Sequence, residues 1–158
     1  MRTNGYPPSE ISKTLNKPQS LTTDATATAS SVHKNDNLHY GATGAVDSDV
    51  STSWMSADSL ATLTVELRKK STFNKFFIIA GENSIRRFAV EVEKESSWAP
   101  VYQSDLLPET HQNSFMGYGV IEFALPEALT TRKFRMNIQQ SNGHPTIYSI
   151  RLQQKNKR

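Results

Sequence analysis

The sequence contains no cysteine among its 158 residues, so disulfides and thiolate metal sites are both excluded. No apolar run approaches the length of a transmembrane helix, and the first residues lack the apolar stretch of a signal peptide. Charge of one sign is also scarce, because 18 Lys and Arg stand against 15 Asp and Glu, for a formal net charge of +3. We therefore expect neither a membrane nor a nucleic acid among the partners of this chain.

Catalytic motifs are missing from the sequence as well. It has no nucleophile elbow, no glycine-rich loop that would cradle a phosphate, and no cysteine nucleophile. A glycosidase needs two facing carboxylates, and the spacing of the acidic residues singles out no pair. We therefore predict a protein that is not an enzyme.

Alternation of apolar and polar residues is the main pattern that is present. It recurs in four stretches, at Ala61–Leu67, Phe88–Val92, Ile121–Leu125 and Phe134–Ile138. Residues 73–80 are apolar nearly throughout, which is typical of a central strand covered on both faces. We expect the chain to turn at residues 69–72 and the third run to end at Pro126. Many short strands without a long helical pattern predict an all-β fold, an antiparallel sandwich or barrel.

The composition changes near both ends of the chain. Residues 1–22 are rich in Pro, Ser, Thr and Asn and read as a linker or irregular N-terminal segment. Residues 154–158 form a basic tail, which is typical of a solvated terminus. We therefore expect one domain over residues 23–153.

The stretch Ala45–Trp54 combines two aspartates with serine and threonine and ends in a tryptophan. Side chains of Asp, Ser and Thr bond nearby backbone N–H groups and favour tight turns. The same oxygens are the hard donors that Ca²⁺ prefers. Two interpretations stay open: a loop folded around an ion, or a loop closed by its own hydrogen bonds. For Trp54 we favour packing in the core over stacking on a ligand.

Several segments in the right order carry a family resemblance. They are Ala29–Ser31, Ala45–Asp49, Phe88–Val92 followed by Trp98, Arg132–Met136 and Gly143–Tyr148. Together they resemble the galactose-binding-like β-sandwich family, which includes coagulation-factor C-type (discoidin) domains and bacterial carbohydrate-binding modules. The similarity is greatest to modules appended to bacterial α-L-fucosidases and other glycoside hydrolases. It implies a jelly-roll-like β-sandwich whose loops gather at one end.

The resemblance implies that these loops bind a sugar through an aromatic, a histidine or arginine, and amide side chains. The candidates in this sequence are His39, Tyr40, Trp54, Asn83, Arg86, Tyr118, Asn142 and His144. His33 lies in the same loop as His39. Many family members carry a basic residue just before the isoleucine that precedes a core phenylalanine. Here Ser84 precedes Ile85, so the sequence departs from the pattern where an arginine would contact galactose.

The resemblance also implies one Ca²⁺, held by the Asp loop and by a glutamate near the C-terminus. Asp47, Asp49 and Thr52 match the loop part of this ligand set. Ser149 stands at the glutamate position, which removes one charged ligand, and Ca²⁺ affinity depends on ligand charge. The ion and the hydrogen-bonded turn are equally favoured.

These patterns predict a non-catalytic carbohydrate-binding module that binds terminal sugars such as galactose or fucose. We expect it to be a C-terminal accessory domain of a bacterial glycoside hydrolase, with a glycan and an upstream catalytic domain as partners. Its location would be extracellular or periplasmic. One alternative is a structural sandwich that packs on the catalytic domain without binding sugar. Another is a discoidin-like adhesion module, for which Phe115 and Met116 are the candidate apolar contacts.

Overall fold

The computed structural model describes residues 21–22, 24–47, 51–81, 84–107, 114–115 and 118–154, with no side-chain description at 114, 115 and 118. The predicted linker and basic tail therefore lie almost wholly outside the described residues. The elements in chain order are β1 (Thr26–Ala29), η1 (His33–Asn35), α2 (Asn37–Tyr40), η2 (Ala42–Ala45), β2 (Trp54–Met55), β3 (Ala61–Gly81), β4 (Ile85–Lys94), β5 (Ser97–Gln103), β6 (Ser114–Phe115), β7 (Tyr118–Ser141) and β8 (Thr146–Gln153).

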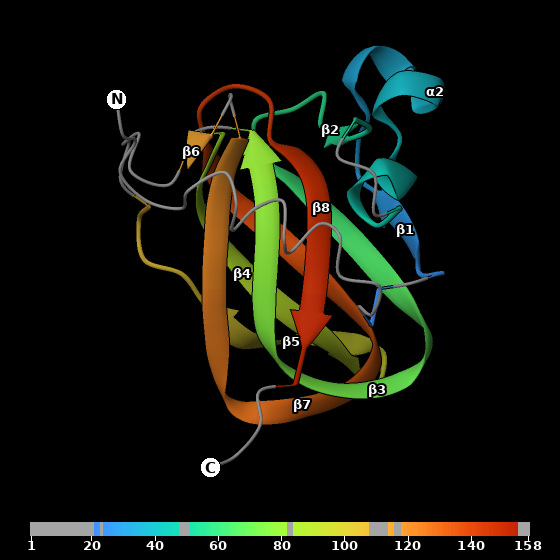
Figure 1. Ribbon diagram of the computed structural model, residues 1–158, viewed down its shortest axis with the longest axis vertical. Helices are drawn as coiled ribbons and strands as arrows, with labels where there is room; N and C mark the ends of the chain where they lie inside the picture. Colours follow the sequence, from blue (N-terminus) through green and yellow to red (C-terminus); the bar gives the residue numbers. More distant parts are fainter. Residues whose placement is uncertain are drawn as a thin grey trace.

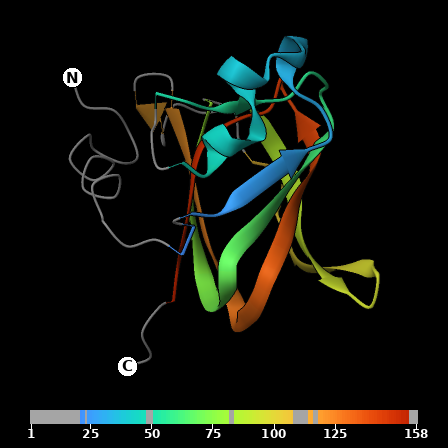
Figure 2. The ribbon, with the colours of Figure 1, turned by 90° about the vertical axis from the view of Figure 1, so that its right-hand side faces the viewer.

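All described strand pairs are antiparallel, in the order β2-β8-β3-β7-β4-β5, with β1 added to β3 and β6 added to β7. The first part of β3 pairs with β1, and its last part pairs with β8. The two long strands β3 and β7 pair along their lengths and pass from one layer of the fold to the other (Figures 1 and 2). The predicted all-β antiparallel sandwich is confirmed.

Two predicted strand ends are wrong, because β3 and β7 each run on where the sequence suggested a break. Residues 69–72 belong to β3, and Pro126 lies inside β7. The register between these strands shifts between Glu66 and Ser71 and again between Phe73 and Lys75. A bulge of this kind bends a strand without ending it. The part of β7 that faces the second shift, residues 125–128, has no paired residue in β3, so the missing N–H of Pro126 breaks no bond of that ladder.

Aromatic side chains from both layers meet in the core. Phe76 and Phe134 lie edge to face with ring centroids 5.6 Å apart, and the rings of Phe88 and Phe123 are 5.4 Å apart. Large rings of this kind dominate the apolar area that a small core removes from water. Phe77 and Ile79, on the opposite face of β3, are 8% and 0% exposed, so the prediction that both faces of this segment are covered is confirmed.

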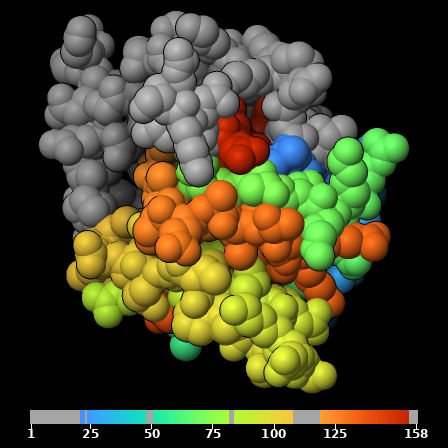
Figure 3. All heavy atoms as spheres, turned by 90° about the horizontal axis from the view of Figure 1, so that it is seen from below, coloured from blue at the N-terminus to red at the C-terminus, as the bar shows by residue number. Residues whose placement is uncertain are grey.

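The connections divide between two ends of the molecule. The loop after β1, the loop after β2 and the β7–β8 turn meet at one end, together with α2 (Figure 1). The opposite end carries the bends of β3 and β7 (Figure 1), and the yellow atoms of the β4–β5 region lie on the face seen from below (Figure 3). The loop after β1 contains the short helices η1, α2 and η2. None of the described helices has the length and apolar character needed to cross a membrane.

Candidate functional site

Two serines hold the loops of the α2 end together. Ser31 follows β1 and Ser56 follows β2, and their hydroxyl oxygens are 2.9 Å apart. The Ser56 amide donates to the carbonyl of Pro145 at 2.9 Å, which ties the β2 loop to the β7–β8 turn. Ser56 itself is completely buried. Three connections that are distant in the sequence are therefore fixed to one another before any ligand binds.

On this support, three rings form a cluster at the loop end, which we call the His33–Tyr40–His144 cluster. The ring centroid of His33 lies 5.0 Å from that of Tyr40 and 4.7 Å from that of His144, both edge to face. The ring of His39 lies 6.3 Å from Tyr40. The structure thus brings together three of the predicted residues, Tyr40, His39 and His144, and places His33 between Tyr40 and His144.

The ring of His144 is held in one orientation. Its Nδ1 lies 2.9 Å from the carbonyl oxygen of Ser56. A carbonyl only accepts, so Nδ1 carries the hydrogen of this bond, and in the neutral imidazole Nε2 is the acceptor. The site therefore presents a hydrogen-bond acceptor at a fixed position.

His39 is oriented in a similar way by Asp36, which the sequence analysis missed. Its Nδ1 lies 2.8 Å from Asp36 Oδ2, and its backbone amide donates to Asp36 Oδ1 at 3.1 Å. The hydrogen bond from His39 lowers the pKa of the Asp36 carboxyl below its usual value. Asp36 is thus the N-cap of α2 as well as the partner of the ring. An aspartate three residues before a histidine, at the start of a helical turn, is the signal that could have identified it.

Trp54 is a core residue, and its assignment as a ligand-binding residue is wrong for this structure. The side chain is completely buried, and its Nε1 donates to the Ser31 carbonyl at 3.0 Å. A ring without exposed surface has no face on which a sugar could stack. The favoured interpretation of Trp54, packing in the core, is confirmed.

Ser84 is built into the support of the site. It is 8% exposed, and its hydroxyl oxygen lies 3.3 Å from the donating amide of Thr146. Its carbonyl accepts from the backbone amide of Asn142 at 3.2 Å. Asn142 is exposed and lies in the same turn as His144, so Ser84 anchors the turn that carries both residues. A long basic side chain at position 84 would have to displace these contacts. The departure from the family pattern at Ser84 therefore has a packing explanation.

Arg86 fastens a neighbouring segment to β4. Its Nε donates to the Leu107 carbonyl at 2.6 Å, and the Leu107 amide donates back to the Arg86 carbonyl at 2.6 Å. The structure brings this arginine beside residue 107. Its predicted sugar contact stays a prediction.

The Asp loop contains a hydrogen bond of its own. The hydroxyl of Thr52 donates to Asp47 Oδ2 at 2.6 Å. Among the described residues, no group of three or more His, Asp or Glu side chains is arranged to hold a metal. Asp47 and Thr52 together supply one carboxylate and one hydroxyl. Ca²⁺ takes about six to eight oxygen ligands, so these two side chains do not by themselves form a Ca²⁺ site.

Ser149, at the position of the family's glutamate, is buried and interacts with a cation. Its hydroxyl oxygen accepts from Arg151 Nε at 3.1 Å, and Arg151 is 3% exposed. Burial lowers the pKa of this guanidinium. A positive charge beside Ser149 opposes the binding of a second cation there.

Some predicted residues fall outside what the structure describes. They are Asn83, Asp49, Met116 and the side chains of Phe115 and Tyr118. The backbone of Tyr118 pairs with Gly81 and with Phe115, so this residue begins β7 beside the end of β3. The roles of these residues stay predictions.

A model of the F5/8 type C domain family matches residues 26–152 of this chain. The match spans every described strand from β1 nearly to the end of β8. No curated protein matches the chain.

Solved structures share the fold. The chain is similar to chitosan-binding module 1 of a chitosanase/glucanase from Paenibacillus sp. IK-5, at 20% identity and a TM-score of 0.66 over 85% of this chain and 98% of that module. It is similar to the family 32 carbohydrate-binding module of NanJ from C. perfringens, in complex with galactose, at 16% identity and 0.67 over 84% and 95%. The family 32 module of EndoD from Streptococcus pneumoniae gives 15% identity and 0.69 over 87% and 100%.

Proposed function

The chain belongs to the F5/8 type C domain family, and from this premise we propose that it is a non-catalytic module that binds a terminal sugar at its loop end. The observation that carries the proposal is the orientation of two imidazoles, His39 by Asp36 and His144 by Ser56. Each ring uses Nδ1 in an internal hydrogen bond and keeps Nε2 for a ligand. Sugar hydroxyls both donate and accept, so acceptors fixed in this way suit them.

The cluster supplies the remaining parts of a sugar site. Tyr40 adds an aromatic ring, and aromatic rings pack against the apolar face of a pyranose. Asn142 adds an exposed amide in the turn that carries His144. His33 positions the rings by contacting two of them. Tyr118 and Asn83 complete the proposed set, and galactose or fucose is the proposed sugar.

Modules with this fold support the choice of ligand class. Structures of such modules contain galactose, N-acetylgalactosamine-β-1,3-galactose and chitotriose. We propose that the module belongs to a secreted bacterial glycoside hydrolase and holds the enzyme's catalytic domain near its glycan. Linkage of this kind raises the effective concentration even when the contact itself is weak.

Adhesion is the second candidate, and one observation favours it. Leu38, in α2 at the loop end, is 87% exposed, and Leu60 is 59% exposed. An exposed leucine at a loop tip suits an apolar surface as well as it suits a sugar. A structural role without a ligand receives less support, because the described large hydrophobic residues that are exposed are these two and Leu106, and none of the three lies within a strand.

Calcium at the Asp loop is a separate proposal that rests on the family resemblance alone. Asp47 and Thr52 are the described residues that would hold the ion. Sugar binding as proposed here does not depend on it.

A glycan-array screen of the full chain tests the proposed function, with His144→Ala and His39→Ala compared with Lys69→Ala at the opposite end. We expect binding to galactosyl or fucosyl glycans that both histidine variants lose and the lysine variant keeps. The screen is repeated with a chelator. Binding of the same proteins to anionic vesicles is measured separately. Silence across the array would overturn the proposal, and vesicle binding abolished by Leu38→Ser would transfer support to adhesion.

A further inference from the structure

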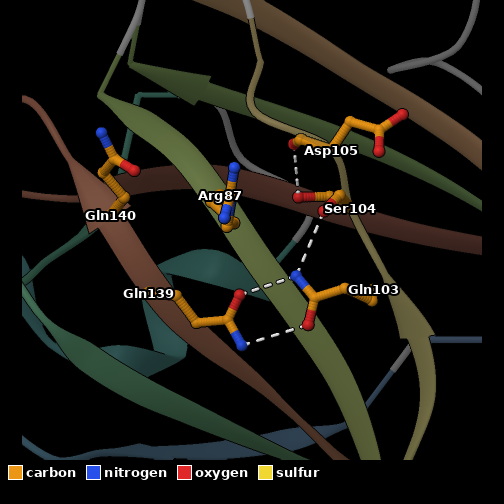
Figure 4. Close-up of a pocket in the computed structure, with 6 residues that line it drawn as sticks. All are labelled: Arg87, Gln103, Ser104, Asp105, Gln139 and Gln140. Carbon is orange, nitrogen blue, oxygen red and sulfur yellow. Dashed lines mark hydrogen bonds between the residues drawn. The ribbon is translucent and has the colours of Figure 1, made fainter.

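A groove lies away from the His33–Tyr40–His144 cluster, on the outer face of the layer formed by β4, β5 and β7. This groove is open to solvent and has a volume of about 640 Å³. Its lining consists of Arg87, Gln103, Ser104, Asp105, Gln139 and Gln140 (Figure 4). Phe88 and Ile138 pair with each other and are buried in the core. Arg87 pairs with Gln140 across a register shift, so that the consecutive residues Gln139 and Gln140 both line the groove. The volume lies within the range of small-ligand sites.

The floor of this groove is rigid. The amides of Gln103 and Gln139 bond to each other twice, with Nε2 to Oε1 distances of 2.7 and 3.2 Å. Nε2 of Gln103 also lies 3.2 Å from the Phe88 carbonyl and 3.1 Å from the Ser104 carbonyl. The Ser104 hydroxyl accepts from the Phe88 amide at 3.0 Å and donates to the Asp105 carbonyl at 2.9 Å. Such fixed amide groups lose little freedom when a ligand binds.

Above this floor, the side chains of Arg87 and Gln140 have no hydrogen-bond or ion-pair partner among the described residues. Figure 4 shows the guanidinium of Arg87 between Gln140 and Ser104, while the carboxylate of Asp105 points away from it. The Arg87 guanidinium, with its donors free, thus faces the groove. The side chains on either side of it in this view, Gln140 and Ser104, are neutral. Arginine binds carboxylates through two parallel hydrogen bonds.

We propose that this groove is a second glycan site, which binds a carboxylate-bearing sugar unit such as a uronic acid. The guanidinium of Arg87 binds the sugar carboxylate, and the amides of Gln140 and Gln139 bind ring hydroxyls. The end of β7 connects the groove to the loop end, since Gln140 stands two residues before Asn142. The choice of a sugar as ligand rests on the proposed function, whereas the carboxylate rests on the groove itself.

Isothermal titration of the full chain with trigalacturonate and with neutral galactotriose tests the proposal. We expect trigalacturonate to bind more tightly, and Arg87→Gln to weaken it roughly tenfold, as the loss of a charge-assisted hydrogen bond predicts. Lys94→Ala, which removes the same charge from the far end of β4, should leave binding unchanged. The side-chain amide signals of Gln103 and Gln139 should shift in NMR spectra when trigalacturonate is added.

Three results would overturn the proposal: equal affinity for the two trimers, an Arg87→Gln variant that binds like the wild type, or displacement of trigalacturonate by an equal concentration of inorganic phosphate. The last would leave a general anion site. A His144→Ala variant separates the two sites, because it should lose galactose and retain trigalacturonate. If galactose binding fails on the array while Arg87-dependent binding of trigalacturonate persists, the proposed function fails and this site stands.

Discussion

The Nδ1 atom of His144 lies 2.9 Å from the carbonyl oxygen of Ser56, a residue 88 positions earlier in the chain. This bond connects the β7–β8 turn to the loop after β2 and fixes which nitrogen of the ring carries the hydrogen. Ser56 is in turn bonded to Ser31, so one buried hydroxyl links the support of the site to the loop that carries His33, His39 and Tyr40. The geometry of the site therefore depends on residues that contact no ligand.

The substitution His144→Asn separates the roles of the two ring nitrogens. Asn at this position places an amide N–H near Nδ1 and can keep the bond to Ser56, but it has no atom at Nε2. We expect His144→Asn to fold with nearly unchanged stability and to lose at least about tenfold in sugar affinity. Titration calorimetry and urea unfolding measure the two effects. Unchanged affinity in His144→Asn would exclude Nε2 as a ligand contact.

Trp54→Phe should lower stability and leave the sugar contacts in place. The substitution removes buried volume and leaves the Ser31 carbonyl without the Nε1 donor, so we expect a loss of about 2–3 kcal/mol in the free energy of unfolding. Urea denaturation measures it, with Trp98→Phe at a partly exposed position for comparison. Normal stability combined with lost sugar binding would contradict the assignment of Trp54 to the core.

Much of the fold was predictable because alternation survives wherever one strand face is buried. The segments around Leu63, Val90 and Phe134 follow the pattern and lie in the core as predicted. The continuation of β3 through Lys69 and of β7 through Pro126 was not predictable, because a bulge permits polar residues and proline within a bent strand. The alternation of apolar and polar residues along a strand gives no signal for such a bend.

The site was predictable only in part, for a different reason. Residue types that suit sugars were identified in several loops, but contacts such as His33 with His144 join segments over a hundred residues apart. Spacing along the chain does not determine such contacts, and only the family resemblance suggested that the loops meet. Ser56 was missed as a support because its partners, Ser31 and the β7–β8 turn, are set by the fold. Asp36 differs, because its partner His39 is only three residues away and the N-cap position was a local signal.

The contact between Asp36 and His39 makes a specific prediction about pH. Because the hydrogen bond from His39 lowers the pKa of Asp36, the carboxyl should titrate below the ordinary aspartate value of about 3.9. A lowered pKa in the folded state stabilises the fold above the unfolded-state value, and this contribution is lost as pH falls through the folded-state pKa. Carboxyl ¹³C NMR of Asp36 measures the midpoint. Asp36→Asn, which keeps an N-cap, is the control for α2, and a wild-type midpoint at or above 3.9 would contradict the contact.

Asp47→Ala tests the Asp loop with and without calcium. Loss of the Thr52 hydrogen bond at this exposed position should cost at most about 1 kcal/mol. Thermal melting in Ca²⁺ and in chelator separates the two interpretations, with Asp58→Ala as a control outside the loop. A calcium-dependent rise in Tm that the variant lacks would support an ion. Equal melting of the wild type in both buffers would leave the hydrogen-bonded turn as the explanation.

Restoring the family's basic residue at position 84 should damage this domain rather than improve its sugar binding. Ser84 is 8% exposed and bonds the backbone of Thr146 and, through its carbonyl, the amide of Asn142. A long charged side chain there must either displace the β7–β8 turn or be buried without a partner, so we expect Ser84→Arg to lose about 2–3 kcal/mol of stability. Ser84→Ala, which removes only the hydroxyl, should lose about 1 kcal/mol. Urea unfolding and galactose titration of both variants measure the outcome. If Ser84→Arg proves as stable as the wild type and binds galactose more tightly, the turn has room for the arginine, and the packing explanation for this departure is wrong.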